Sequence, residues 1–577
     1  MRTLLTTLHS KYIHASLALP CLAAFCGDDC GELLIREFTV HEPKEAVLAA
    51  LLAEEPEVIA FSVYLWNRRE TLELIDALSV ARPGLRLLLG GPEVSFDGPE
   101  LFARHPGLTA LVRGEGELPL RALLTAWQRG EEPGPIPRLC YRTGDDLLEG
   151  PDGAPLKNLD ELPSPFALGR VELNRGLVYF ETSRGCPYRC AFCMSALDQQ
   201  VRSFSPERIR SDLDLLLEHE VPTIKLVDRT FNYDAPRARE IFRYILAHNR
   251  RSRFHFEIGA HLLDEATLAL LETVPPDMFQ FEIGVQSTLP ATLATIERRA
   301  SLAALEENVR RLRRMDNIHL HLDLIAGLPG EGFGDLLGSI DRVAALQPHH
   351  LQLEPVKLLP GAPLRQQADS RGIRFDPNPP YTVLTTPQLS FTDLERLRGI
   401  SRLIDLLCNS SRFEGFLNLL SSHCGSLSAA LTQLESFWRQ AGLFRQPLSQ
   451  RGVFEAVADF IQARFDGTLR EQLREELARD FAHSERVVPG NAPDFFDTGL
   501  SKEEQQRLRQ QVREEQEAIK GQGIKLQHFA AIFRHLPETP GRWVRVFFYY
   551  TETGRGMRVV EQPLVEYSEA NDAGTTD

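Results

Sequence analysis

The sequence predicts an α/β protein in three parts: a doubly wound N-terminal domain, a partial (βα)6 barrel and a mostly α-helical C-terminal region. Strand-like and helix-like segments alternate over residues 1–133, and six more such units fill residues 172–384. Amphipathic helices dominate residues 385–577. The Pro- and Gly-rich segment 134–171 is expected to be a linker. A chain of 577 residues is too long for one core, which agrees with several domains.

The N-terminal segments predict an open parallel sheet with helices on both faces, a Rossmann-like arrangement. The strand-like segments are 3–8, 33–40, 58–64, 85–92 and 108–117, and the helix-like segments are 16–25, 44–54 and 68–81. Ligands of such sheets bind outside the carboxyl ends of the strands. Three turns fall there, "SVYLWN", "GGPEVS" and "RGEGE", and glycines in the last two let the backbone approach a ligand. Ordinary tight-turn chemistry is the alternative interpretation.

The second alternating region predicts a TIM-like barrel of six βα units. Its strand-like segments are 176–183, 223–228, 254–260, 279–287, 318–327 and 350–358. One helix is expected to begin at Ser205, with Pro206 as its first helical residue. Functional groups of such barrels stand at the carboxyl ends of the strands. Three cysteines, Cys186, Cys190 and Cys193, directly follow the first strand and are therefore placed for chemistry.

The C-terminal region predicts amphipathic helices within residues 391–407, 434–443 and 470–482. A small β hairpin is expected from residues 542–550 and 555–562. The last ten residues, "SEANDAGTTD", are expected to be disordered.

Composition limits the classes of function. The formal net charge is −16, which makes a nucleic-acid partner improbable because such binding depends on phosphate neutralisation. No run approaches the roughly 18 to 20 apolar residues of a membrane span. The N-terminal segment does not resemble a signal peptide, so a cytoplasmic location is expected. Nine cysteines in such a chain favour metal binding or catalysis over disulfides.

Three cysteines within eight positions allow three interpretations. A structural zinc site wants four ligands, for which only the distant Cys408 and Cys424 are candidates. A redox pair would use Cys190 and Cys193 and leave Cys186 without a role. Three thiolates can instead hold three irons of an iron–sulfur cubane and leave the fourth iron open for a ligand.

The pattern C-x3-C-x2-C, with Phe192 before its last cysteine and after the first strand of a six-unit barrel, resembles the radical S-adenosylmethionine (SAM) superfamily. "EIGVQS" and "LIAGLPGE" resemble that family's fourth- and fifth-strand motifs. The resemblance implies a 4Fe-4S cluster on Cys186, Cys190 and Cys193, with SAM on the open iron. The implied SAM contacts are Phe192, Asp228, Glu282, Gln286, Ser287 and Gly327. The second strand departs from the family, with "VDRTFN" where a Gly-Gly-Glu type of motif is usual, so the role of Asp228 is the least constrained.

A doubly wound domain before such a barrel resembles the cobalamin-binding domain of one radical SAM subgroup, and "GGPEVS" and "RGEGE" match turns of that subgroup. The resemblance implies cobalamin contacts at Ser62, Gly90, Gly91, Pro92, Ser95, Gly114 and Glu115. The D-x-H-x-x-G motif that supplies a cobalt-ligating histidine elsewhere is absent, and His9 and His14 lack its spacing. The C-terminal region resembles an uncharacterised domain appended to one branch, and we expect it to shield radicals from solvent.

Together these features predict a cobalamin-dependent radical SAM enzyme that forms a 5′-deoxyadenosyl radical and methylates an unactivated carbon of a small-molecule or peptide substrate. A reductant such as flavodoxin or ferredoxin is the expected partner. Two alternatives stay open: a radical cyclase or ring-rearranging enzyme with the same cofactors, and a non-enzymatic cobalamin or redox sensor. His319, His321, His349 and His350 are expected to be polar barrel residues and not a second metal site.

Overall fold

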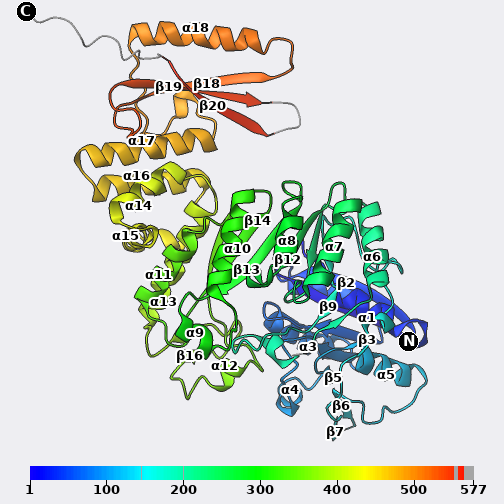
Figure 1. The fold of residues 1–577 in the computed structure, drawn as a ribbon. Helices are drawn as coiled ribbons and strands as arrows, with labels where there is room; N and C mark the ends of the chain where they lie inside the picture. The colour runs from blue at the N-terminus through cyan, green and yellow to red at the C-terminus, as the bar shows by residue number, and fades with distance from the viewer. Residues whose placement is uncertain (145, 199, 552–555, 565–577) are drawn as a thin grey trace, which may run out of the picture. The chain divides into compact units, whose positions relative to one another are not determined.

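The computed structural model describes residues 1–144, 146–198, 200–551 and 556–564 (Figure 1). The chain forms two compact units. The first contains Met1–Leu336, Leu346–His349 and Leu353–Leu394, and therefore holds both alternating regions. The second contains Leu337–Ala345, His350–Gln352 and the described residues from Glu395 onward.

The N-terminal domain is built on a seven-stranded sheet of order β2-β1-β3-β4-β5-β6-β7. Strands β1 to β5 pair in parallel, and β6 and β7 are antiparallel to their neighbours. The strands are β1 (Arg2–His9), β2 (Glu32–Thr39), β3 (Val58–Ser62), β4 (Arg86–Gly90), β5 (Leu108–Val112), β6 (Leu139–Thr143) and β7 (Asp146–Glu149). The helices are α1 (Ala18–Cys26), α2 (Lys44–Ala53), α3 (Arg68–Ala81), α4 (Pro99–Arg104) and α5 (Glu117–Gln128).

Both faces of this sheet are buried, which explains why its strands read as nearly continuous apolar runs. Leu4 and Leu8 of β1 pack into one core with Leu51 of α2 and Leu78 of α3. Their neighbour Leu5 points to the opposite face and joins a second core with helices α1 and α5. This confirms the predicted doubly wound arrangement.

The predicted linker 134–171 needs correction, because β6 and β7 lie within it and extend the first sheet. Leu139 and Tyr141 are buried in the core beneath α1 and α5, which anchors β6 to the sheet. The short apolar alternation of this segment is hidden in the sequence by the Pro- and Gly-rich stretches on both sides of it.

The second alternating region forms one six-stranded sheet of order β15-β14-β13-β12-β11-β8, as the six predicted βα units require. Neighbours from β8 to β14 pair in parallel. The strands are β8 (Leu177–Phe180), β11 (Thr223–Leu226), β12 (Arg253–Glu257), β13 (Phe279–Gln286), β14 (His319–Ala326) and β15 (His350–Pro355). Between them lie helices that include α6 (Pro206–Glu218), α7 (Ala235–His248), α8 (Glu265–Leu271), α9 (Pro290–Thr295), α10 (Leu302–Met315) and α11 (Phe333–Ala344). The Ser205 hydroxyl caps α6 at the backbone N–H of Arg208, as expected.

The two faces of the second sheet differ in chemistry. One is aromatic, since Phe256 packs on Phe231, Phe242 and Phe279 with ring centroids 4.7 to 5.2 Å apart. Phe242 belongs to α7, so this face is the one the helices cover. Alternation along the strands places polar side chains on the opposite face, and we call this the polar face of the sheet.

The second unit is mostly helical and ends in a three-stranded antiparallel sheet of order β18-β19-β20. Its helices include α13 (Phe391–Leu403), α14 (Glu414–Cys424), α15 (Leu427–Gln440), α16 (Gln450–Arg464), α17 (Gly467–Ser484) and α18 (Lys502–Ala518), and its strands are β18 (Lys525–Phe533), β19 (Trp543–Thr551) and β20 (Met557–Pro563). The expected hairpin is β19–β20. Strand β18 was not predicted; with α18, whose Val512 packs on Ile532 and Val544, it completes a small core.

The C-terminal tail for which disorder is expected lies outside the described residues. Among the described residues, no helix combines the length and apolar character needed to cross a membrane.

Replacing Phe256 with Ala should destabilise the first unit by about 3 to 5 kcal/mol, because a fully buried ring at the centre of the aromatic cluster would leave a cavity. Phe256→Leu should cost under about 1.5 kcal/mol, since it keeps more of the volume. Urea unfolding followed by far-UV circular dichroism measures both. Equal losses for the two variants would show that the ring cluster is not tightly packed.

Candidate active site

The three cysteines lie in one closed loop. After β8 the chain forms β9 (Ser183–Arg184), which pairs antiparallel with β10 (Arg202–Ser203). We call residues 185–201 the cysteine loop; the structure describes it apart from residue 199. Gly185 opens the loop at φ +92°, and a side chain there would stand 2.5 Å from the backbone oxygen of Gln200. The entry to the loop therefore requires glycine.

The three thiols are neighbours with separate contacts. The Cys186 sulfur lies 3.6 Å from the Thr230 hydroxyl, and the Cys190 sulfur accepts from Arg298 at 3.6 Å. The Cys193 sulfur accepts from the backbone N–H of Ser195 at 3.4 Å. Burial raises the pKa of the Cys190 thiol, and the other two thiols raise it further, which places all three within electrostatic reach of one another.

The donor set fits a cluster better than a single ion. Among the described residues, no three His, Cys, Asp or Glu side chains are gathered closely enough to hold one metal ion. Thiolates on three corners of a cubane bind different irons, so they need not converge on one point. The two other zinc candidates, Cys408 and Cys424, lie in the second unit.

A polar cavity of about 160 Å³ adjoins the cysteine loop at the carboxyl ends of β11, β12 and β13. It is lined by Tyr188, Arg229, Thr230, Glu257, Ile258, Gly259, Glu282, Gly284, Gln286, Arg298 and Asp323. Thr230 and Arg298 also contact cysteine sulfurs, so a ligand in this cavity would lie directly beside the thiols. Of the residues predicted to contact SAM, Glu282 and Gln286 line it.

Charges within this cavity are compensated on the polar face of the sheet. Glu282 lies 2.8 Å from the His255 ring nitrogen and 3.3 Å from the Lys225 ammonium. Burial opposes ionisation of Glu282, but these partners outweigh it and lower its pKa to about 2. Burial, with the nearby charge of Glu282, raises the pKa of Glu257 to about 7.

Gln286 is strained and polar at the cavity wall. Its φ is +70°, a conformation rare for a residue with a side chain. Its amide oxygen is buried without a hydrogen-bond partner among the described residues. A ligand that donates a hydrogen bond here would satisfy that oxygen, so the cavity wall favours a polar ligand.

Four other residues predicted to contact SAM do not line this cavity in the described structure. Asp228 is fully buried and accepts hydrogen bonds from the Thr182 N–H and from the hydroxyls of Thr182 and Ser183. Gly327 is left-handed, and a side chain there would stand 2.7 Å from Val383. Ser287 is buried, and Phe192 is half-buried. Their roles as SAM contacts stay predictions, and for Asp228 the contacts show a carboxylate that fixes the end of β8.

The Ser287 hydroxyl donates a hydrogen bond to the carboxyl group of Glu331, which is fully buried. Burial raises the pKa of Glu331 to about 7, because its effect is larger than that of the Ser287 hydroxyl, which stabilises the charged form. This pair therefore holds a proton near neutral pH, close to the end of β13.

A larger cavity of about 460 Å³ lies at the carboxyl ends of β3, β4 and β5. All seven residues predicted to contact cobalamin line it: Ser62, Gly90, Gly91, Pro92, Ser95, Gly114 and Glu115. Ser95 joins the two glycine turns, since its hydroxyl donates to the Gly91 oxygen at 2.8 Å and accepts from the Gly114 N–H at 3.0 Å. A side chain at Gly91 would stand 2.6 Å from the Val63 oxygen, so the turn cannot carry one. The cavity continues between the sheet and helices α1 and α5, where Leu19, Leu22 and Leu120 make it apolar.

The second wall of this cavity is the cysteine loop, which contributes Met194, Ser195, Leu197 and Asp198. Arg229 lines this cavity and the polar one as well. The sequence placed Arg229 at a strand end but did not indicate that it would stand where two cavities meet. Nothing in the sequence indicated that the cysteine loop would also line the cavity of the N-terminal domain.

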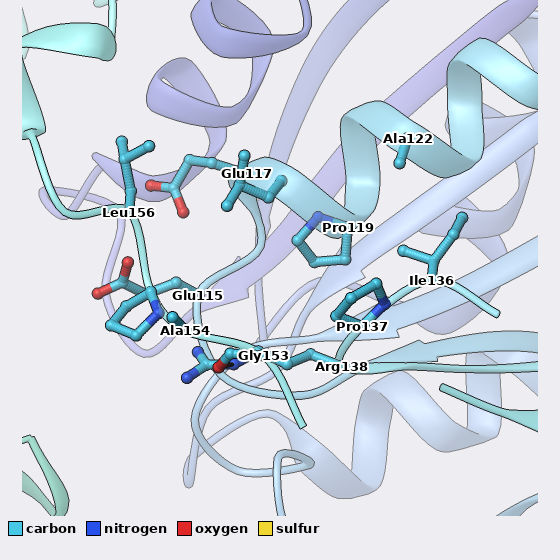
Figure 2. A pocket seen from close by; sticks show the side chains of 12 residues that line it. Glu115, Glu117, Pro119, Ala122, Ile136, Pro137, Arg138, Gly153, Ala154 and Leu156 are labelled. Atoms are coloured by element: carbon cyan, nitrogen blue, oxygen red, sulfur yellow. Dashed lines mark hydrogen bonds between the residues drawn. The ribbon is translucent and has the colours of Figure 1, made fainter. Parts of the chain in front are cut away.

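A third cavity of about 310 Å³ shares Glu115 and Glu117 with the large one (Figure 2). Its other described lining is mostly apolar. Figure 2 shows the two carboxylates at one end, near Leu156, and Ile136 with Ala122 at the other. The loop that carries Glu115 thus separates two hollows of the N-terminal domain.

Two cavities at the carboxyl ends of two parallel sheets, connected by a loop that carries three thiols, form the candidate active site. Family models agree over three segments: a B12 binding domain over residues 4–124, the radical SAM superfamily over 180–343, and a protein of unknown function (DUF4080) over 369–532. The chain therefore contains three successive segments that match the B12 binding domain, the radical SAM superfamily and DUF4080.

Individual proteins show similar combinations. The chain is 30% identical over 362 residues to the cobalamin-dependent radical SAM methyltransferase TokK of Streptomyces tokunonensis, a match that covers 57% of this chain and 51% of TokK. It thus spans about half the length of that relative. The solved structure of the radical SAM methyltransferase TsrM from Kitasatospora setae, with cobalamin and a [4Fe-4S] cluster bound, matches with a TM-score of 0.54 at 19% identity, over 69% of this chain and 81% of TsrM.

The cobalamin-dependent radical enzyme OxsB, solved with aqua-cobalamin and SAM, matches with a TM-score of 0.59 at 16% identity, over 90% of this chain and 81% of OxsB. At these identities the two structures establish the fold. The radical SAM domain implies a 4Fe-4S cluster and SAM, and the B12-binding domain implies cobalamin.

Glu331→Gln should change how stability depends on pH. Because the folded pKa of Glu331 is raised to about 7, its contribution is complete below the unfolded pKa near 4.5 and disappears as pH rises through 7. Gln keeps the shape and does not ionise, so the variant should gain stability relative to the parent between pH 5 and pH 8, by up to about 3 kcal/mol. Melting temperatures of both proteins across that range measure the difference. A constant difference would show that Glu331 does not bind the extra proton.

Proposed function

We propose that this protein is a cobalamin-dependent radical SAM enzyme that methylates an unactivated carbon of a small-molecule or peptide substrate. The observation that carries this proposal is the meeting of the two cavities at the cysteine loop and Arg229. A methyl donor in one cavity and a radical source in the other must both reach one substrate carbon. Adjoining cavities satisfy that requirement.

When bound, the cluster would supply the electron that cleaves SAM to a 5′-deoxyadenosyl radical, and cobalamin, remethylated by a second SAM, would supply the methyl group. In the full reaction, the substrate C–H bond and the sulfur–C5′ bond of one SAM would break, and the substrate hydrogen would leave in 5′-deoxyadenosine while methionine is released. The methyl group of the second SAM would form the new C–CH₃ bond with S-adenosylhomocysteine as its leaving group, and the reductant would supply two electrons per turnover.

The residues of the chain position these groups. Cys186, Cys190 and Cys193 would hold the cluster, with Thr230 and Arg298 beside two of the sulfurs. Gln286, with its free amide oxygen, and Glu282 would contact SAM in the polar cavity. The glycine turns tied by Ser95 would let the corrinoid approach the ends of β4 and β5.

Methyl transfer is preferred over the cyclase or rearranging alternative because TokK and TsrM are both named methyltransferases. SAM labelled with a CD₃ group distinguishes the two, since only methyl transfer adds the label to the product. The sensor alternative predicts no SAM cleavage after reduction.

A low-potential reductant such as flavodoxin or ferredoxin is part of the proposal, because SAM cleavage consumes an electron. All nine cysteines are free thiols, which agrees with a reducing compartment such as the cytoplasm.

Anaerobic reconstitution with iron and sulfide, followed by reduction in the presence of SAM, should yield 5′-deoxyadenosine. Replacing Cys186, Cys190 and Cys193 together with Ala should abolish both the visible cluster absorbance and this product, because these are the thiols that the cysteine loop places beside the polar cavity. The matched control replaces Cys408 and Cys424 with Ala, which should keep both signals. A cluster that survives the first change would mean that other cysteines hold it.

Purified protein incubated with hydroxocobalamin should retain about one corrinoid per chain after desalting. Leu22→Trp should reduce this binding at least about tenfold, because the larger ring would occupy the apolar part of the large cavity. Leu48→Trp is the control: Leu48 is a similarly half-buried leucine on the opposite face of the same sheet. If both variants bind corrinoid as the parent does, this cavity is not the cobalamin site.

A further inference from the structure

The neck of the cysteine loop contains two arginines that face each other. Arg184 and Arg202 are directly paired in the antiparallel β9–β10 ladder. Like charges in such positions repel and destabilise a ladder, and a two-residue pair of strands has little other stabilisation. Both side chains are also largely buried, with 14% and 6% of their surface exposed. The neck therefore depends on nearby carboxylates.

Two of those carboxylates come from the N-terminal domain. Glu115 binds Arg202 through both oxygens, at 2.5 and 3.2 Å, and its carboxylate also lies 3.6 Å from Arg184. Glu117 binds Arg184 at 2.7 Å. Glu115 therefore lies close to both arginines, and its contact with Arg202 has the bidentate geometry that makes such pairs strong. Arg202 holds Glu115 charged, since it lowers the pKa of that carboxyl against the effect of burial.

Arg202 also connects Glu115 to Cys186, the first cysteine of the loop. Arg202 also binds Asp198 at 2.8 Å, and the backbone oxygen of Asp198 accepts the N–H of Cys186 at 3.1 Å. Hydrogen bonds through Arg202 and Asp198 therefore connect Glu115 to the backbone of Cys186.

The other end of this path is the large cavity. Gly114, Glu115, Gly116 and Glu117 line it from the N-terminal domain. Arg184 lines it from the neck and Asp198 from the cysteine loop. A ligand that fills the cavity orders both sides of the ion-pair cluster. Cys186, Cys190 and Cys193, when they hold a cluster, would fix the cysteine loop and with it the neck. Both events favour the same arrangement of Glu115, Arg184 and Arg202.

We propose that Glu115, Arg184 and Arg202 couple the two cofactor sites, so that corrinoid binding stabilises the iron–sulfur cluster and the cluster strengthens corrinoid binding. The inference rests on the proposed function for the identity of the two cofactors. Thermodynamic linkage requires the coupling factor to be the same in both directions. Glu115, predicted from the sequence as a cobalamin contact, then acts as a positioning residue for the cysteine loop.

Two measurements that need no substrate test this coupling. The first is the dissociation constant of hydroxocobalamin for the cluster-loaded protein and for the variant lacking the three cysteines. The second is the rate at which a chelator bleaches the cluster, with and without saturating hydroxocobalamin. We expect corrinoid to bind roughly fivefold or more tightly when the cluster is present, and bleaching to slow when corrinoid is present.

Arg202→Gln should remove the coupling. Arg202 binds Glu115, which lines the large cavity, so corrinoid affinity is measured with and without the cluster and the coupling factor is the ratio of the two dissociation constants. Arg208→Gln is the matched control, because Arg208 also binds a carboxylate, Asp212 at 2.8 Å, and a backbone oxygen, Leu162 at 2.5 Å. It should keep the full coupling factor. If Arg202→Gln does not fold, Arg202→Lys, which keeps the charge and loses the bidentate geometry, should show a reduced factor.

The outcomes distinguish a failure of the coupling from a failure of the proposed function. A parent protein that binds both cofactors with a coupling factor of one overturns this inference and leaves the proposed function standing. Equal effects of Arg202→Gln and Arg208→Gln also overturn it, since general destabilisation would then explain both. A parent protein that retains no corrinoid or forms no cluster contradicts the proposed function itself.

Discussion

Parallel strand pairing is the constraint on which both candidate cofactor sites depend. Because all strands of a parallel sheet point the same way, their carboxyl ends meet at one edge. In the N-terminal sheet this gathers the turns after β3, β4 and β5 around the large cavity. In the second sheet it gathers the ends of β11, β12 and β13 around the polar cavity. The cysteine loop follows β8 at the corresponding end and lines the large cavity, while Thr230 and Arg298 connect the loop to the polar one.

Charged groups at these strand ends are costly to bury, and two of them have close polar partners. Glu282 is held between His255 and Lys225, and Asp228 accepts three hydrogen bonds around Thr182 and Ser183. Such networks fix side-chain positions more sharply than apolar packing does. The proposed radical chemistry would benefit from that rigidity, because its intermediates need a site that excludes water.

The sequence predicted the parts of the molecule whose patterns are local. The cysteine spacing, the strand–helix alternation and the glycine turns are all read within a few residues, and the seven residues predicted for cobalamin line one cavity. Strands β6 and β18 were missed because their signal depends on burial against distant helices. Arg229 was not predicted to line both cavities, because a junction between two cavities has no sequence pattern. Ser287 matched a motif, yet its hydroxyl is bound to Glu331 inside the protein.

The sequence "VDRTFN" after β11, which differs from the Gly-Gly-Glu type of motif usual in the family, can be explained from the structure. Asp228 and Arg229 are adjacent, and the chain sends them to different places after β11. The carboxylate of Asp228 turns inward to the end of β8, immediately before the cysteine loop. The side chain of Arg229 is exposed and reaches both cavities. A motif in which a carboxylate faced the cavity would leave the end of β8 without these hydrogen bonds. Asp228 therefore fixes the start of the loop that carries the thiols, and Arg229 places a positive charge where the two cavities meet.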